Sequence, residues 1–119
     1  MVGKDLATRI LERGLEAASL RQRILAHNVA NVATPGFKRS RVEFEDQLAV
    51  ALAEGQDPDA VVPRVEVDKD SEGRPDGNNV DIELEMTRMA ENQIFYAALT
   101  RELSNQFERL RMAINDGRR

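Results

Sequence analysis

The C-terminal third of the chain repeats apolar residues at alternating steps of four and three, over more than four heptads. Eight of the ten positions in this row are apolar or aromatic. The row consists of Ile82, Met86, Met89, Gln93, Tyr96, Thr100, Leu103, Phe107, Leu110 and Ile114. This spacing is typical of coiled-coil packing, in which one helix buries its apolar row against another. The pattern therefore predicts a long helix that needs a second helix beside it.

The ends of this helix carry recognisable signals. Asn78 and Asn79 are good N-cap residues, and acidic residues follow them in the first turns, where the helix dipole favours negative charge. Arg109 and Arg111 suit the opposite end, and Gly117 is expected to terminate the helix.

A second helix is expected near the N-terminus, from about Lys4 to Ala33. Its apolar residues also follow a helical period, and the stripe is Leu6, Ile10, Ala17, Ile24 and Asn31. Thr34, Pro35, Gly36 and Phe37 then predict a type II turn, which would allow Phe37 to fold back on the helix end.

Asn28 and Asn31 share the apolar face of this helix with Ile24, which has two interpretations. Amides on an apolar seam can fix register and partner choice at a cost in stability. Alternatively, they belong to a frayed, solvated last turn that stops at Pro35.

The middle of the chain, residues 37–77, is expected to be loop-rich. A short helix is predicted from Val42 to Leu52, and a short edge strand over residues 61–67, where Pro63 limits pairing. The fold class is therefore mainly α, with residues 1–36 as an N-terminal helix and turn, 37–77 as an insert, and 78–119 as a C-terminal helix. The two helices would form one composite, coiled-coil-like domain.

Composition argues against catalysis and for a partner. The chain has no cysteine, one histidine and no glycine-rich phosphate loop, so we expect no enzyme activity, no metal and no cofactor. A loop starting at Asp68 resembles a calcium loop, but Asn79 replaces the bidentate glutamate at its twelfth position. The net charge of −4 gives no basic field for nucleic acid. Aromatic residues make up only 4%, so a partner is expected to complete the core.

No apolar run approaches the roughly 20 residues of a membrane span, and the N-terminus lacks the apolar core of a signal peptide.

Two stretches resemble the flagellar basal-body rod protein family. The first carries the N-terminal signature of rod and hook proteins, in Asn28, Ala30, Asn31, Thr34, Pro35, Gly36, Phe37 and Lys38. The second, from Gly77 to Ile114, is similar to the C-terminal segment of the proximal rod members. It includes Asn79, Val80 and Asp81 at its start and Asn92, Gln93 and Tyr96 at its centre.

The resemblance implies a structural subunit of the proximal rod, which assembles helically, transmits torque and lines the export channel. The implied partners are further copies, FlgC-like, FlgF-like and FlgG-like rod subunits, a FliE-like adaptor, and MS-ring and export-gate proteins. The implied location is the basal body outside the inner membrane, periplasmic where a periplasm exists, reached by flagellar type III export. The residues expected to guide assembly are Asn28, Asn31, Pro35, Gly36 and the seam residues Met89, Tyr96, Leu103, Phe107 and Leu110.

A different class of function is also compatible with long acidic helices. The chain could be a soluble coiled-coil adaptor or a flagellar export chaperone that never joins a fibre. In the rod interpretation, the isolated subunit is expected to be partly disordered and to order on assembly.

Overall fold

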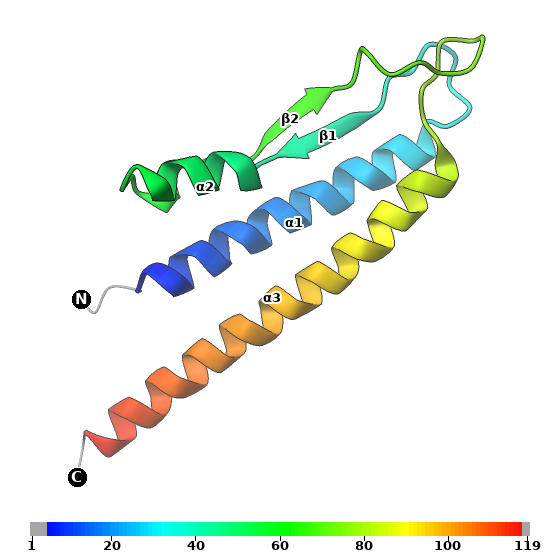
Figure 1. The fold of residues 1–119 in the computed structure, drawn as a ribbon. Helices are drawn as coiled ribbons and strands as arrows, with labels where there is room; N and C mark the ends of the chain where they lie inside the picture. Colours follow the sequence, from blue (N-terminus) through cyan, green and yellow to red (C-terminus); the bar gives the residue numbers. More distant parts are fainter. Residues whose placement is uncertain (1–4, 118–119) are drawn as a thin grey trace.

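Two long antiparallel helices dominate the computed structural model, which describes residues 5–117 (Figure 1). The elements in chain order are α1 (Leu6–Ala30), β1 (Ser40–Glu43), α2 (Glu45–Ala53), the 3-10 turn η1 (Pro58–Ala60), β2 (Arg64–Val67) and α3 (Ile82–Asp116). The predicted mainly α fold, with paired terminal helices and a short mixed middle segment, is confirmed.

The α1 helix lies between two layers, with α3 on one side and the hairpin and α2 on the other (Figure 1). Towards α3, the side-chain amide of Asn92 donates to the carbonyl oxygen of Ala18 at 2.8 Å. Towards the hairpin, Arg21 donates to the carbonyl oxygen of Val42 at 3.2 Å. The buried apolar residues are Ala17, Ala18, Leu25, Val42, Phe44, Ala51 and Val80.

The molecule is much longer than it is wide. Its extents are 70 × 28 × 19 Å and its radius of gyration is 18.5 Å, against about 13.5 Å for a compact chain of this length. The accessible surface is 8053 Å², about 1,500 Å² more than a compact monomer of this mass exposes. Within residues 5–117, none of the helices is both long and apolar enough to cross a membrane.

The helix ends differ from the sequence-based expectation. The α1 helix begins after Asp5, whose side chain accepts from the backbone nitrogen of Thr8 at 2.8 Å. The expected start at Lys4 lies outside the described residues, and the helix ends at Ala30, before Ala33.

The N-cap of α3 was predicted wrongly. Asp81 caps this helix by accepting from the backbone nitrogen of Leu84 at 3.2 Å. Asn78 and Asn79 do not cap it, because their side chains bind backbone groups elsewhere in the chain. Gly117 is the C-cap, as expected.

The middle segment contains more β structure than predicted. Val42 does not begin a helix. It lies in β1 and pairs with Val65 of the antiparallel strand β2. The predicted strand is confirmed only from Arg64, with Pro63 outside it. Strand geometry at Val42 buries the side chain against α1, and the helix begins three residues later, at Glu45.

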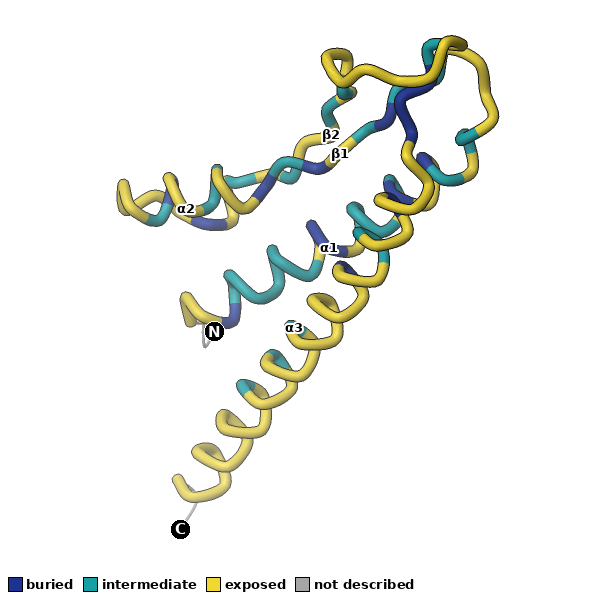
Figure 2. The backbone as a smooth tube through the Cα atoms, turned by 45° about the vertical axis from the view of Figure 1, so that its right-hand side comes forward, coloured by how far each residue is buried: buried dark blue, intermediate teal, exposed yellow. Residues whose placement is uncertain are grey.

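The apolar row of α3 is not the row that faces α1. Only Met89 and Leu103 of the predicted row are half-buried. The apolar and aromatic members Ile82, Met86, Tyr96, Phe107, Leu110 and Ile114 are 44% to 53% exposed. The buried positions of α3 are polar, Glu85 and Asn92, seven residues apart. Figure 2 shows α3 exposed along most of its length.

Candidate assembly site: the turn junction

Three distant stretches meet where α1 ends and α3 begins. They are the last turn of α1, residues 31–40, and residues 73–85 (Figure 1). We call this region the turn junction. Its buried polar residues are Asn28, Arg39, Asn78, Asn79 and Glu85. Buried polar groups are costly unless they are hydrogen-bonded, so each must find a partner inside the chain.

Asn28 joins α1 to the start of β1. Its amide nitrogen donates to the carbonyl oxygen of Ser40 at 2.8 Å, and its amide oxygen accepts from the Ser40 nitrogen at 2.9 Å. The same amide nitrogen lies 3.2 Å from the Glu85 carboxylate. The interpretation of Asn28 as part of a frayed, solvated turn is therefore wrong.

Glu85 is a fully buried carboxylate, with a side-chain exposure of 0%. It forms an ion pair with the guanidinium of Arg39 and a second with Arg88, at 3.0 Å. The Oδ2 atom of Asp68 lies 3.9 Å from the Nη1 atom of Arg39. Because a buried charge is tolerated only when it is paired and hydrogen-bonded, Glu85 fixes both the hairpin and α1 against the first turn of α3.

Asn78 holds the C-terminal end of α1. Its amide nitrogen donates to the carbonyl oxygens of Asn31, Val32 and Thr34, at 2.9, 3.1 and 2.8 Å. These carbonyl groups belong to Asn31, the C-cap of α1, and to the turn that follows it. Asn78 binds them from 44 to 47 residues away.

Asn79 binds the chain that leaves the turn. Its amide oxygen accepts from the backbone nitrogen of Arg39 at 2.7 Å, and its amide nitrogen donates to the carbonyl oxygen of Asp68 at 2.8 Å. The backbone nitrogen of Asn79 also donates to the carbonyl oxygen of Phe37 at 3.3 Å.

The predicted turn at residues 34–37 is confirmed. The nitrogen of Phe37 donates to the carbonyl oxygen of Thr34 at 3.2 Å, and Gly36 has a φ of 75°, as the third position of a type II turn requires. The Phe37 ring contacts His27 edge-on, with ring centroids 5.6 Å apart. Lys38 donates to the carbonyl oxygen of Gly77.

A close backbone approach completes the junction. A Cβ atom at Gly73 would lie 2.1 Å from the carbonyl oxygen of Asn78. That oxygen accepts from the nitrogen of Arg74 at 2.9 Å. Only glycine at position 73 allows its backbone to lie this close to the backbone of Asn78.

The loop before the junction holds one perturbed carboxylate. Hydrogen bonds from Ser71, first from its hydroxyl and then from its backbone nitrogen, lower the pKa of Asp68 below its ordinary value of 3.8. These bonds also use the carboxylate oxygens that the calcium-loop interpretation would have needed. Residues 5–117 contain no group of three or more His, Asp or Glu side chains placed to hold a metal ion.

The structure brings most predicted motif residues together. Those in or beside the turn junction are Asn28, Asn31, Thr34, Pro35, Gly36, Phe37, Lys38, Asn79, Val80 and Asp81. Ala30 is exposed nearby. Asn92 lies further along α3, bound to Ala18 and to the side chain of Gln22 at 2.9 Å. Gln93, Tyr96, Leu103, Phe107, Leu110 and Ile114 lie outside the junction on α3.

Three junction residues were missed from the sequence as site residues: Arg39, Asn78 and Glu85. Glu85 precedes the buried Asn92 by seven residues, and this spacing on one helix face was the available signal. Arg39 belongs to the basic run Lys38, Arg39 and Arg41, and nothing in such a run indicates which of its members is buried.

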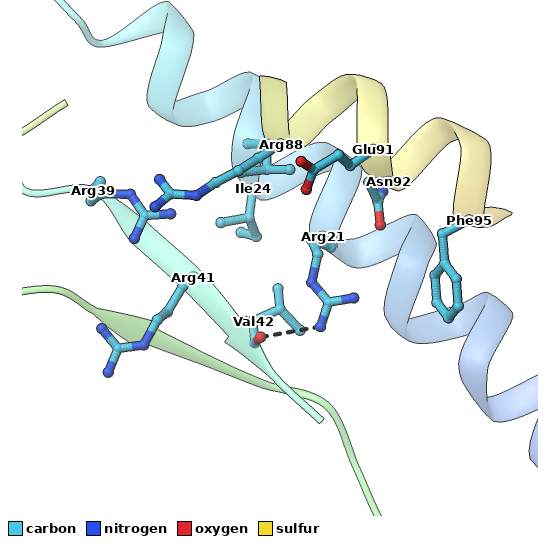
Figure 3. Close-up of a pocket in the computed structure, with 10 residues that line it drawn as sticks. Arg21, Ile24, Arg39, Arg41, Val42, Arg88, Glu91, Asn92 and Phe95 are labelled. Carbon is cyan, nitrogen blue, oxygen red and sulfur yellow. Dashed lines mark hydrogen bonds between the residues drawn. The ribbon is translucent and has the colours of Figure 1, made fainter. Parts of the chain in front are cut away.

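An open groove lies beside the junction, between α1, β1 and α3 (Figure 3). Its volume is about 360 Å³. Its apolar lining comes from Ile24, Leu25, Val42 and Phe95, and its polar lining from Arg21, Arg39, Arg41, Arg88, Glu91 and Asn92. We call it the arginine-rimmed groove.

Known proteins resemble this chain over nearly its whole length. A family model described as "Flagella basal body rod protein" matches residues 9–38, which cover most of α1 and the turn after it. The chain is 33% identical to the flagellar basal body rod protein FlgB of Borrelia hermsii, covering 92% of this chain and 96% of that protein. It is 32% identical to FlgB of Bacillus subtilis, covering 91% and 92%. FlgB of Escherichia coli is 28% identical, covering 95% and 96%. The chain belongs to the FlgB family of flagellar basal body rod proteins.

Proposed function

We propose that this protein is a structural subunit of the proximal rod of the bacterial flagellum. The observation that carries the proposal is the turn junction, which ties the N-terminal motif to the start of α3 through Asn28, Asn78 and Glu85. The junction makes one rigid end, while α3 keeps a long apolar row half-exposed. A subunit with a well-bonded end and an exposed apolar row on α3 is expected to bury that row against neighbouring subunits in an assembly.

In this proposal the subunits stack helically around a central export channel and transmit torque. A contact between different surfaces of identical subunits generates a ring or a helix, depending on whether it closes. The proposed neighbours are further copies, FlgC-like, FlgF-like and FlgG-like rod subunits, a FliE-like adaptor, and the MS-ring and export-gate proteins. The proposed site is the basal body outside the inner membrane, reached by flagellar type III export.

The motif residues divide into two roles. We propose that Asn28, Asn31, Pro35 and Gly36 shape the end of each subunit through the turn junction. The exposed seam residues Tyr96, Phe107 and Leu110, with half-buried Met89 and Leu103, would be covered by neighbouring subunits. The role is structural, without catalysis.

The test is an in-frame deletion of the gene, scored by motility and by electron microscopy of purified basal bodies. The expected result is loss of rod, hook and filament with retention of the membrane ring, and recovery on complementation. Complete basal bodies in the deletion strain would contradict the proposal and favour a soluble adaptor or export chaperone.

A further inference from the structure

Two polar side chains of α3 bind α1 from the same face of the helix, one heptad apart. The Glu85 carboxylate accepts from the side-chain amide of Asn28 at 3.2 Å. The Asn92 amide donates to the carbonyl oxygen of Ala18 at 2.8 Å and to the side chain of Gln22 at 2.9 Å. The two α3 residues are buried, at 0% and 6% exposed. The face of α3 that pairs with α1 is therefore marked by a carboxylate and an amide.

This face continues at Leu99, seven residues after Asn92. A Cβ atom at Gly14 of α1 would lie 3.3 Å from the Leu99 side chain, so these two positions face each other. Gln106, a further seven residues along, is half-buried. Three of the four residues in this row, Glu85, Asn92 and Gln106, are polar. The inner row of an ordinary helix pair is apolar.

The more apolar face of α3 lies only part of a turn away. Met89 and Leu103 of the apolar row are half-buried, so this row overlaps the edge of the face towards α1. Met86 and Phe107 of the same row are 53% and 50% exposed. A rotation of α3 by about 50° around its axis would turn the apolar row towards α1. Apolar burial alone therefore favours the face that the chain leaves open.

Packing leaves room for such a rotation at mid-length. Asn92 lines two open grooves, the arginine-rimmed groove (Figure 3) and a second groove of about 320 Å³. Glu91 and Phe95 line the first groove from α3, and Gln93 and Tyr96 line the second. Open space therefore flanks the contact on both sides of Asn92, and the hydrogen bonds of its amide hold α3 between the two grooves.

We propose that Glu85 and Asn92 are specificity-determining residues, which select the face of α3 that pairs with α1 and so keep the apolar row outside. A rotated α3 would take Glu85 away from Asn28 and from buried Arg39. It would also break both hydrogen bonds of Asn92 to α1. A polar residue at such a position fixes the pairing of helices at a cost in stability. The inference rests on the proposed function only in giving the open row a use, its burial by neighbouring subunits.

Disulfide trapping within one chain tests the choice of face, because the chain contains no cysteine. One full-length protein carries Gly14→Cys with Leu99→Cys, which report the observed face. Another carries Gly14→Cys with Thr100→Cys, which report a rotated helix. Both are oxidised at low concentration in a stabilising osmolyte, and the intramolecular disulfide is measured by mass spectrometry. With Glu85 and Asn92 in place, the Leu99 pair should form about five times more disulfide than the Thr100 pair, because a disulfide needs Cβ atoms about 4 Å apart.

The test variant adds Glu85→Gln and Asn92→Leu to both proteins, which removes the buried charge and the amide. The two cysteine pairs should then form disulfide in amounts within about a factor of two of each other, since the rotated face becomes accessible. The matched control is Asn105→Leu, the same substitution on the exposed surface of α3, which should leave the excess of the Leu99 pair unchanged.

Asn92→Leu alone gives a second readout. It should move the disulfide ratio in the same direction. It should also be at least as stable to urea as Asn105→Leu, because half-buried Gln22 can bind water in place of the lost amide. Replacing a residue that only stabilised the helix pair would instead lower the stability.

An undiminished excess of the Leu99 pair in both variants would overturn the inference. Lower stability of Asn92→Leu than of Asn105→Leu would overturn it as well. If circular dichroism shows that the double variant has lost helix, Asn92→Leu alone decides, and its disulfide ratio must fall by about a factor of two or more. Because the gene deletion tests the rod assignment in cells, failure of this experiment on a purified single chain and failure of the proposed function are distinguishable.

Discussion

Asn28 and Ser40 are joined by two hydrogen bonds, both between the side-chain amide of Asn28 and the backbone of Ser40, at 2.8 and 2.9 Å. The amide group of Asn28 thus takes the place that a neighbouring strand residue would take in a β-ladder. It extends the hairpin onto the surface of α1. The nearby Glu85 carboxylate then accepts from the same amide nitrogen at 3.2 Å.

Replacing Asn28 with Asp should strongly destabilise the subunit. The change removes the donor to Ser40 and places a second carboxylate beside buried Glu85. We expect a loss of about 3 kcal/mol in the free energy of unfolding, since it leaves an unpaired buried charge. The measurement is urea unfolding followed by circular dichroism, at a fixed concentration of a stabilising osmolyte. The matched control is Asn105→Asp on the exposed surface of α3, and equal stability of the two variants would contradict the prediction.

Gly73→Ala should disrupt the turn junction through a steric clash. The added Cβ would lie 2.1 Å from the carbonyl oxygen of Asn78, so the backbone must move and its hydrogen bond from Arg74 is lost. We expect about 2 kcal/mol or more of destabilisation in the same unfolding assay. Gly117→Ala is the control, because a Cβ there meets its nearest atom at an ordinary 3.4 Å. If Gly73→Ala behaves like the control, the loop does not approach Asn78 this closely.

Leu103→Asp and Leu110→Asp should each stop incorporation into the rod. Leu110 is 49% exposed, and a carboxylate there would have to be buried without a partner when a neighbour covers the seam. The readout is immunoblotting of purified basal bodies, together with motility. Met112→Asp is the control, since Met112 is also exposed on α3 but lies outside the seam. Normal motility of both leucine variants would contradict the prediction and show that the seam is not part of the assembly surface.

The Ser71 hydroxyl should set the titration of Asp68. Its hydrogen bond is the largest cause of the lowered pKa of this carboxyl. The pKa of Asp68 is lower in the folded chain than in the unfolded chain, where it has its ordinary value of 3.8. Ionised Asp68 therefore stabilises the fold at pH values above 3.8, and this stabilisation disappears as the pH falls through the lowered folded-state pKa. In Ser71→Ala we expect the pKa of Asp68 to rise towards 3.8, as measured by NMR titration. An unchanged pKa would assign the shift to the backbone donors alone.

The isolated subunit should be less helical in dilute solution than in the structure. Helices α1 and α3 contain 25 and 35 residues, but their contact is supported by few large apolar side chains. Within residues 5–117, three of the seven buried apolar residues are alanines, Ala17, Ala18 and Ala51. Circular dichroism of the dilute full-length protein should show reduced helix content and a broad thermal transition. A sharp, cooperative and stable melt would contradict this prediction.

The helices and the turn were predictable because they depend on local sequence. The period of apolar residues indicated α1 and α3, and Pro35 with Gly36 defined the turn. The antiparallel hairpin was missed in part. Val42 was assigned to a helix, whereas its pairing with Val65, 23 residues later, decides its conformation.

The polar contacts of the junction were less predictable. Asn28 was singled out because an amide on an apolar stripe is unusual, but its partners Ser40 and Glu85 could not be deduced from spacing. Asn79 was given the role of a helix cap, which local propensity favours. In the structure its amide binds the chain at Arg39 and Asp68 instead. Such contacts join residues tens of positions apart, and no local pattern encodes them.

The turn junction has a consequence for the order in which the chain acquires its shape. Asn28 is bonded to a residue 57 positions later, and the end of α1 is held by Asn78. When the polypeptide emerges N-terminus first, from a ribosome or any narrow conduit, α1 has no complete partner until more than two thirds of the chain has appeared. The last residues to emerge then add to α3 from the junction towards the start of α1. The subunit therefore closes from the turn junction towards its two termini, and α1 lacks this partner for most of the passage.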